Sequence, residues 1–392
     1  MFETLSHLAL QQYWWILIAI LGAALIFMMF VQGGQVIYNI LGKTDKEKNL
    51  VLNAIGKHYK LTFSVFVVFG WAVFAAFPSF YATTFGWAYL VWMAILFLMI
   101  VQAVSYEYRS KLDNFLWKKT YDTFLFLNGL LVPFLLWVAV ATFFTWSNFI
   151  IETSNLVDFA GNNIHISSWT TPFYGLEALW NTNQMAFVTN ISLWLAVTFL
   201  VQVLALLYVI HHIKDKVLVE RASKMLIPVS AVFLIFFLTF VYKILTISGF
   251  AVESELSIVN MESYKYLNNL ISNHFSHFLF VSGTLLVLTW IGLGILKKSR
   301  NWFWISGLGT FFVVISIFLL VWLNNTSFYP SLVDLESSLT IRNSSSSYYT
   351  LIVMSYVSLM LPFVLMYVIW AWRIIAWEQM KETDLKKGLE HY

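Results

Sequence analysis

Two glutamines, Gln32 and Gln35, lie near the end of a long apolar run, with Gly33 and Gly34 between them. Residues three apart in a helix share one side, and small residues let a neighbouring helix approach closely. A glutamine amide donates and accepts hydrogen bonds but does not ionise, so it can hold water in place without carrying a proton itself. The pair therefore predicts a polar contact between packed helices.

Ionisable residues inside apolar runs are few, and each is a candidate functional group because a charge in a membrane is costly. Lys243 lies about 10 Å from the end of its run, where it could extend to the interface or form a buried pair with a role in proton transfer. His274 and His277 could bind a metal, but no third ligand is evident, and interfacial histidines are the simpler interpretation. His211 and His212 lie at a basic helix end, where we expect them to be solvated.

Haem iron needs an axial histidine, methionine or cysteine. The chain has no cysteine, and none of its eight histidines lies near the middle of an apolar run. Methionine commonly fills gaps between apolar helices, so the 12 methionines do not indicate ligation. The sequence also has no phosphate-binding loop, no HExxH zinc helix and no Ser-His-Asp pattern. We therefore expect no catalytic residue, metal site or haem ligand in this chain.

The elements that position these residues must be membrane helices. The chain is 60% hydrophobic and 11% charged, whereas a soluble domain carries about 25% charged residues. In lipid, the backbone must be satisfied within a helix or a closed barrel. The apolar runs do not alternate, so an all-α polytopic membrane protein is predicted.

Nine runs are long enough to cross a bilayer, which takes about 20 residues each. They cover residues 13–38, 62–82, 86–105, 121–147, 186–210, 225–250, 277–296, 302–323 and 351–377. None of the connecting loops is long enough for a separate domain, so residues 1–392 are predicted to form one membrane domain. The halves 1–150 and 186–323 could form two four-helix bundles of like orientation, with span 351–377 as an extra helix.

Basic residues indicate how the chain crosses the membrane. Twenty of the 23 Lys and Arg residues fall in alternate loops, after the first, third, fifth, seventh and ninth spans. Cytoplasmic loops carry the excess of positive charge. The pattern predicts an N-terminus outside and a C-terminus in the cytoplasm, as an odd number of spans requires.

Five segments in order carry a resemblance to a known family. They are "YWWILIAILGAALIFMMF", "LGKTDKEKNLVLNAIGKHYK", "FAAFPSFYAT", "VSYEYRSKLDNFLWKK" and "SLTIRNSSSSYYTLIVMSY". In this order and spacing, the chain resembles subunit II of the cytochrome bd-type quinol oxidases from about residue 10 to residue 392. The family's nine-span topology with the N-terminus outside agrees with the topology predicted from charge.

The resemblance implies a heterodimer in the bacterial cytoplasmic membrane that oxidises quinol and reduces dioxygen to water. Subunit I of that family holds haems b558, b595 and d, so this chain would be the haem-free partner that supports it. Lipid, a quinone and a small accessory subunit are further partners that the resemblance allows, whereas nucleic acid is not expected.

The same resemblance marks a tentative proton path. Relatives carry Asp-Gly-Phe-Asp where this chain has Gln32 to Gln35, and an aspartate where it has Lys60. Glu107 keeps a carboxylate at the family's aspartate position, and Asp122 begins the next span on the same side. A buried carboxylate with a raised pKa can exchange protons near neutral pH, and a glutamine cannot.

Of the two carboxylates, Glu107 is the preferred member of a surviving path. The alternative for Glu107 is a surface ion pair with Arg109 or Lys111.

Two other functions stay open at the level of the sequence. A secondary transporter usually has broken helices and polar binding residues at mid-membrane, but here only Pro133, Pro228 and Pro362 fall within spans and Lys243 is the one intramembrane charge. A purely structural membrane partner is the third hypothesis.

Overall fold

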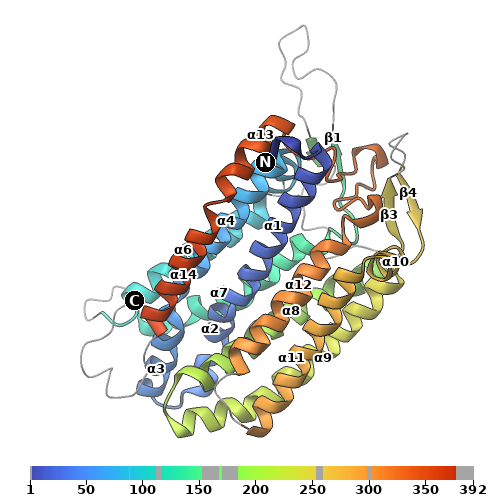
Figure 1. Cartoon of the computed structure of the whole chain (residues 1–392). Coiled ribbons are helices and arrows are strands. Elements are labelled where there is room, and N and C mark those ends of the chain that lie inside the picture. The colour runs from blue at the N-terminus through green and yellow to red at the C-terminus, as the bar shows by residue number, and fades with distance from the viewer. Residues whose placement is uncertain are drawn as a thin grey trace.

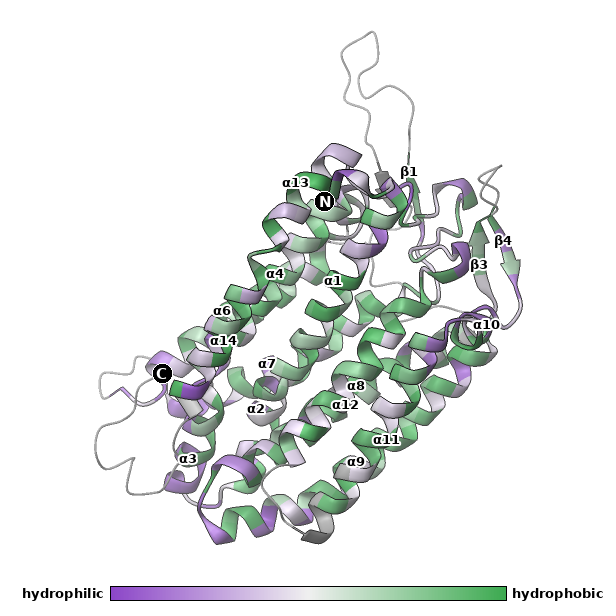
Figure 2. Cartoon of the chain, in the orientation of Figure 1, coloured by the Kyte–Doolittle hydropathy of each residue, from purple (hydrophilic) through white to green (hydrophobic). Residues whose placement is uncertain are grey.

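The computed structural model describes residues 2–87, 89–111, 117–151, 167–169, 184–252, 259–297 and 302–376. Long helices run side by side through this part of the chain (Figure 1). Apolar residues cover their length, and polar residues gather toward the two ends of the bundle (Figure 2). Eight helical segments of the described residues are long and apolar enough to cross a membrane, or nine if the bent last pair counts as one span. The predicted all-helical membrane class is confirmed.

The first half contains the helices that form the candidate site. They are α1 (His7–Met28), α2 (Phe30–Leu41), α3 (Asp45–Gly56), α4 (Tyr59–Ala76), α5 (Pro78–Tyr81), α6 (Tyr89–Tyr108) and α7 (Lys118–Ala141), with a 3-10 turn η1 (Phe2–Thr4) and a π-helix η2 (Ala82–Trp87). The second span was predicted to run to residue 82, but α4 ends at Ala76. Pro78 disfavours helical backbone at the residue before it, and Phe77 accordingly has φ −132° and ψ 67°.

The second half repeats the pattern of long helices. They are α8 (Gln184–His212), α9 (Lys216–Thr246), α11 (His274–Lys297), α12 (Trp302–Leu320), α13 (Tyr348–Ser358) and α14 (Leu361–Ala376), with the shorter α10 (Lys265–Ser272), η4 (Leu323–Asn325) and η5 (Leu335–Ser337). Helix α9 starts well before the predicted residue 225. Asp215 caps it by accepting hydrogen bonds from the backbone N–H groups of Val217 and Leu218, so the helix begins outside the apolar run.

The last span is broken, although the sequence predicted one uninterrupted helix over 351–377. Helices α13 and α14 meet at an angle of 42°. Pro362 is the second residue of α14, and its ring cannot fit against the carbonyl four residues earlier, which belongs to Ser358, the last residue of α13. The bend follows from this proline. Residues 377–392, which the charge pattern assigns to the cytoplasm, lie outside the described residues.

Two short antiparallel hairpins lie at the end of the bundle that carries the N-terminus (Figure 1). Strand β1 (Phe149–Ile151) pairs with β2 (Ser167–Trp169), and β3 (Gly249–Val252) pairs with β4 (Val259–Glu262). The sequence analysis did not predict them. Nearby, the Tyr266 hydroxyl donates to the carbonyl of Phe144 at 3.3 Å, and burial raises the pKa of Tyr266. That hydroxyl therefore stays a neutral donor that joins α10 to the end of α7.

Candidate functional site

Helix α2 is wedged between α7 and α8, and glycines make the fit possible. A Cβ atom on Gly33 would lie 2.0 Å from the carbonyl oxygen of Val201 in α8. A Cβ atom on Gly129 of α7 would lie 2.4 Å from the carbonyl oxygen of Gln32. Neither space admits a methyl group, so the close helix approach that the sequence predicts for the Gly pair is a property of the fold.

The two glutamines of α2 both face α6. The Gln32 amide nitrogen donates to Gln102 Oε1 at 3.1 Å, and the Gln35 amide nitrogen donates to the Tyr106 hydroxyl at 3.1 Å. All four side chains are buried. The side-chain amide oxygens of the two residues, Gln32 Oε1 and Gln35 Oε1, have no hydrogen-bond partner among the described residues. Each of these oxygens is therefore an unpaired acceptor in the interface between α2 and α6.

One turn further along α2, the contacts between helices involve charged side chains. The Tyr38 hydroxyl donates to Asp122 Oδ1 at 2.8 Å. Arg109 Nε donates to the same oxygen at 2.5 Å, and its Nη1 donates to Asn49 Oδ1 at 2.7 Å. The Arg109 side chain is 1% exposed and that of Asp122 is 17% exposed. A buried arginine of this kind must be paired, and its hydrogen-bond partners come from α3 and α7, while its guanidinium lies over the Tyr38 ring of α2.

These residues form separate hydrogen-bonded groups that follow one another along α2, and we call them together the polar column. It consists of Gln32, Gln35, Tyr38, Asn49, Gln102, Tyr106, Arg109, Asp122 and Asn128. Asn128 belongs to it because it precedes Gly129 and donates to the Leu98 carbonyl at 2.8 Å, leaving its own Oδ1 without a partner among the described residues. Arg109 Nη2 is a further unpartnered atom. Buried polar groups are nearly always hydrogen-bonded to protein or to ordered water, so these unpartnered atoms are the positions at which ordered water would bind.

Glu107 and Lys60 lie outside the column, at the surface. Lys60 Nζ is 3.8 Å from Glu107 Oε1, and the two side chains are 63% and 42% exposed. The predicted alternative paired Glu107 with Arg109 or Lys111, but Arg109 pairs with Asp122. Tyr59, whose hydroxyl is hydrogen-bonded to Glu107, stacks on Tyr106 with ring centroids 4.9 Å apart. Glu107 thus reaches the column only through a pair of tyrosines.

The remaining sequence candidates lie elsewhere. Lys243 is partly buried in the last turn of α9, and His274 and His277 are exposed, as interfacial histidines would be. The expectation that His211 and His212 are both solvated is wrong for His212, which is 1% exposed and stacks on Tyr208 with centroids 5.3 Å apart. Helix α8 is buried up to this residue, so its last turn still lies within the protein core and not in solvent.

His58, which matches a histidine of the family pattern at the entry to the second span, received no predicted role from the sequence. Its ring is fully buried, its Nε2 is 2.8 Å from the Tyr208 hydroxyl, and Trp372 of α14 stacks on it at 4.1 Å. No group of three or more His, Cys, Asp or Glu side chains among the described residues could hold a metal ion. The signals that could have found the column were Gln102, a polar residue inside an apolar run, and Tyr38 and Tyr106 at helical spacing from the glutamines.

Comparison with known proteins places the fold in a family. The family model "Cytochrome bd terminal oxidase subunit II" matches residues 10–375. The chain is similar to cytochrome bd ubiquinol oxidase subunit 2 of Bacillus subtilis, with 31% identity over 137 residues, or 35% of this chain and 40% of that protein. It is also similar to cytochrome bd-I ubiquinol oxidase subunit 2 of Escherichia coli, with 26% identity over 160 residues, or 40% of this chain and 42% of that protein. These matches span about two fifths of the relatives' length.

A solved structure extends the likeness of the fold. A chain in the structure of bd oxidase from Geobacillus thermodenitrificans superposes with a TM-score of 0.60 at 14% identity, covering 94% of this chain and 99% of that chain. The family match covers residues 10–375 of the 392 and includes every helix of the polar column. The chain therefore belongs to the subunit II family of the cytochrome bd terminal oxidases and is a multi-pass protein of the bacterial inner membrane.

Proposed function

We propose that this chain is subunit II of a quinol:oxygen oxidoreductase and works beside a haem-bearing subunit I. The family match over residues 10–375 is the observation that carries this proposal. The relatives that it resembles are named as subunits of ubiquinol oxidases. In the proposed complex, the partner holds haems b558, b595 and d, quinol is the reductant and this chain ligates no haem.

The topology is part of the proposal. We infer an N-terminus outside and a C-terminus in the cytoplasm, because twenty of the 23 basic residues fall in alternate loops. We also infer one membrane domain built from two four-helix bundles, α1–α7 and α8–α12, with α13 and α14 added. Packing of α8 against both α9 and the column helix α2 supports a single domain.

Deletion and purification test the complex. Purification through a tag on this chain should bring down a haem-carrying partner, and deletion should abolish quinol oxidase activity together with the haem d absorption band of the membranes. A chain that purifies alone as a stable monomer, with unchanged haem d spectra in the deletion strain, would refute the proposal.

For the site, we propose that the polar column holds ordered water and conducts protons from the cytoplasmic side toward the interior. Asp122 is the carboxylate near the cytoplasmic end, and the Tyr38 hydroxyl that donates to it continues the line of hydrogen-bonding groups toward the interior. Gln35 Oε1 and Gln32 Oε1 then provide unpaired acceptors at successive turns. The distance from Tyr38 to Gln32 along the helix axis is about 9 Å. Amides cannot ionise, so their role is to hold water molecules in line.

This arrangement changes the order of preference between the two carboxylates. Asp122 contacts the column directly, whereas Glu107 is exposed and paired with Lys60. We therefore propose Asp122 as the cytoplasmic entrance, with Glu107 and Lys60 at most an auxiliary surface pair. Proton uptake by the intact oxidase in sealed vesicles distinguishes a conducting column from a purely structural one, because only the former links Asp122 to the uptake rate.

A further inference from the structure

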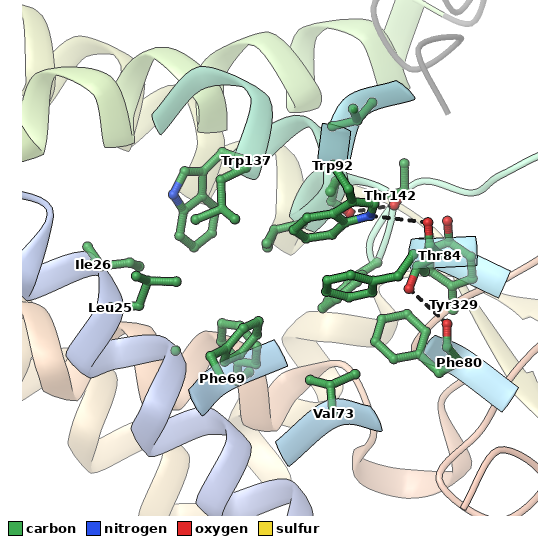
Figure 3. A pocket seen from close by; sticks show the side chains of 18 residues that line it. Leu25, Ile26, Phe69, Val73, Phe80, Thr84, Trp92, Trp137, Thr142 and Tyr329 are labelled. Carbon is green, nitrogen blue, oxygen red and sulfur yellow. Dashed lines mark hydrogen bonds between the residues drawn. The ribbon is translucent and has the colours of Figure 1, made fainter. Parts of the chain in front are cut away.

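Two enclosed apolar cavities lie inside the bundle, away from the polar column. The first is lined by α1, α4, α6 and α7 with residues such as Leu25, Phe69, Val73 and Trp92, and Figure 3 shows these side chains around an open centre. The second lies among α8, α9, α11 and α12. Both are lined by Ile26 and Trp137. These two shared side chains are therefore the wall between neighbouring cavities.

The size of each cavity limits what can enter. Each has a volume of about 40 Å³. A site for one water-sized molecule needs about 10–15 Å³, and an apolar cavity of about 150 Å³ takes up benzene or xenon. Each cavity is larger than a single water site and much smaller than the benzene-sized cavity, so we expect it to take one diatomic molecule or one xenon atom and no aromatic ring or acyl chain.

The lining disfavours ordered water. A buried water needs two to four polar partners. In the first cavity, the hydroxyls of Thr84 and Thr142 donate to carbonyls of their own chain segments at 2.8 and 2.6 Å. Among the described lining residues this leaves the Trp137 indole N–H as a buried donor without a partner. In the second cavity, Thr310 donates to Ser306, and Thr284 is the lining hydroxyl without a partner. The few polar atoms lie in linings that are otherwise apolar, so we expect neither cavity to hold ordered water.

An aromatic stack separates the first cavity from the surface of the bundle. Phe85 and Trp92 both line the cavity and both are partly exposed, and their rings stack with centroids 3.8 Å apart. Tyr81 continues the stack at 4.5 Å from Phe85. Phe85 belongs to the π-helix η2, a local geometry that often marks functional sites. Small movements of these rings would connect the cavity to the lipid, where apolar gases dissolve.

We propose that the two cavities form a paired binding site for small apolar gas molecules, and that dioxygen occupies them in the working complex. The choice of dioxygen rests on the proposed function, because a terminal oxidase consumes it. The affinity for an apolar gas rests only on the volume and lining of the cavities. The two parts of the proposal can therefore be tested separately.

Xenon is the probe for the cavities. The intact two-subunit complex, frozen under xenon pressure and examined by cryo-electron microscopy or diffraction, should show xenon in both cavities. Ala139→Val should remove xenon from the first cavity alone, and Ala196→Val from the second alone, because each adds two methyl groups to one lining. The matched control Ala72→Val, on α4 but outside both linings, should leave both xenon positions occupied. Ile26→Ala, which shortens the shared wall, should merge the two positions and increase xenon uptake.

Two results would overturn the site: ordered water or lipid in the cavities of the wild-type complex, or no xenon in either. Dioxygen applied together with xenon should lower xenon occupancy in both cavities, and unchanged occupancy would overturn the assignment to dioxygen. None of these readouts needs turnover. If the complex binds xenon but has no quinol oxidase activity, the proposed function fails and the gas site stands.

Discussion

The Tyr38 hydroxyl donates to Asp122 across the seam between α2 and α7 at a distance of 2.8 Å. This contact joins the first span to the start of the fourth and places a carboxylate at the end of a line of buried amides. Arg109 holds the same carboxylate from α6. Residues from three spans are thus hydrogen-bonded through one oxygen atom. Together they form the proposed proton entrance.

Removal of the Tyr38 hydroxyl tests the link between Asp122 and the column. We expect Tyr38→Phe to slow proton uptake and quinol-driven oxygen consumption several-fold while it costs about 1 kcal/mol of stability, the usual contribution of one hydrogen bond. Oxygen-electrode rates and pH-dye signals in sealed vesicles measure both effects. Tyr121→Phe, a buried tyrosine in the first turn of α7, is the matched control and should keep full activity. Equal rates for the two variants would contradict conduction through Tyr38.

Neutralising Asp122 should be more damaging than neutralising Glu107. Asp122→Asn leaves the buried Arg109 without its counter-charge, and breaking a buried pair costs about 3–5 kcal/mol. The double variant Asp122→Asn with Arg109→Gln removes both charges, so its stability should recover while its proton uptake stays slow. Recovery of uptake along with stability would show that Asp122 has a structural role only.

Glu107→Gln should change little. The pair with Lys60 is exposed, and such pairs contribute about 0–1 kcal/mol. We expect oxygen consumption by Glu107→Gln and by Lys60→Gln to remain close to that of the wild-type complex across pH. A pH-dependent loss of turnover in Glu107→Gln, with Asp122→Asn unaffected, would restore Glu107 as the entrance.

The glycine contacts of α2 predict a difference in stability. Gly33→Ala places a methyl group against the backbone of α8, where the nearest atom is 2.0 Å away, and overpacking of this kind costs about 1–3 kcal/mol. Gly70→Ala is the matched control, because the nearest atom to its added Cβ is 3.9 Å away. The melting temperature of the purified complex should fall for Gly33→Ala and hold for Gly70→Ala. Similar melting temperatures for both would mean that α2 can shift.

Attachment of the last helix depends on Trp372. This side chain is 8% exposed and stacks on His58, whereas most large side chains of α14 are exposed. Truncation of a buried tryptophan costs about 3–5 kcal/mol, so Trp372→Ala should lower the melting temperature of the complex and make α14 more accessible to protease in detergent. Trp117→Ala, at a residue that is 84% exposed, should do neither. Unaltered protease patterns in Trp372→Ala would show that other contacts hold α14.

The sequence predicted the features that depend on composition and local spacing. Apolar runs located the helices, and the spacing of Gln32 and Gln35 placed both side chains on one side of α2, where they meet α6. The break in the last span lies at Pro362, a local signal that the sequence contained.

Features that depend on tertiary packing could not be predicted in the same way. Arg109 was counted as a loop cation because it follows an apolar run, yet three other helices close over it. His212 was expected in solvent for the same reason. A hydropathy pattern indicates which segments are apolar enough to lie in lipid. It does not indicate which other helices pack over the ends of a segment.

The wedged position of α2 has a consequence for the chemistry that this scaffold can acquire. Glycines at the backbone contacts hold the helix in place, so a side-chain replacement that keeps the same shape would not require the helix to move. Glutamine and glutamate have the same shape, and Gln35 already lies with one oxygen unpartnered beside Tyr106. The single replacement Gln35→Glu would therefore place a carboxylic acid in the buried position that the amide now occupies. The interface between α2 and α6 is thus one substitution away from holding a buried carboxylate.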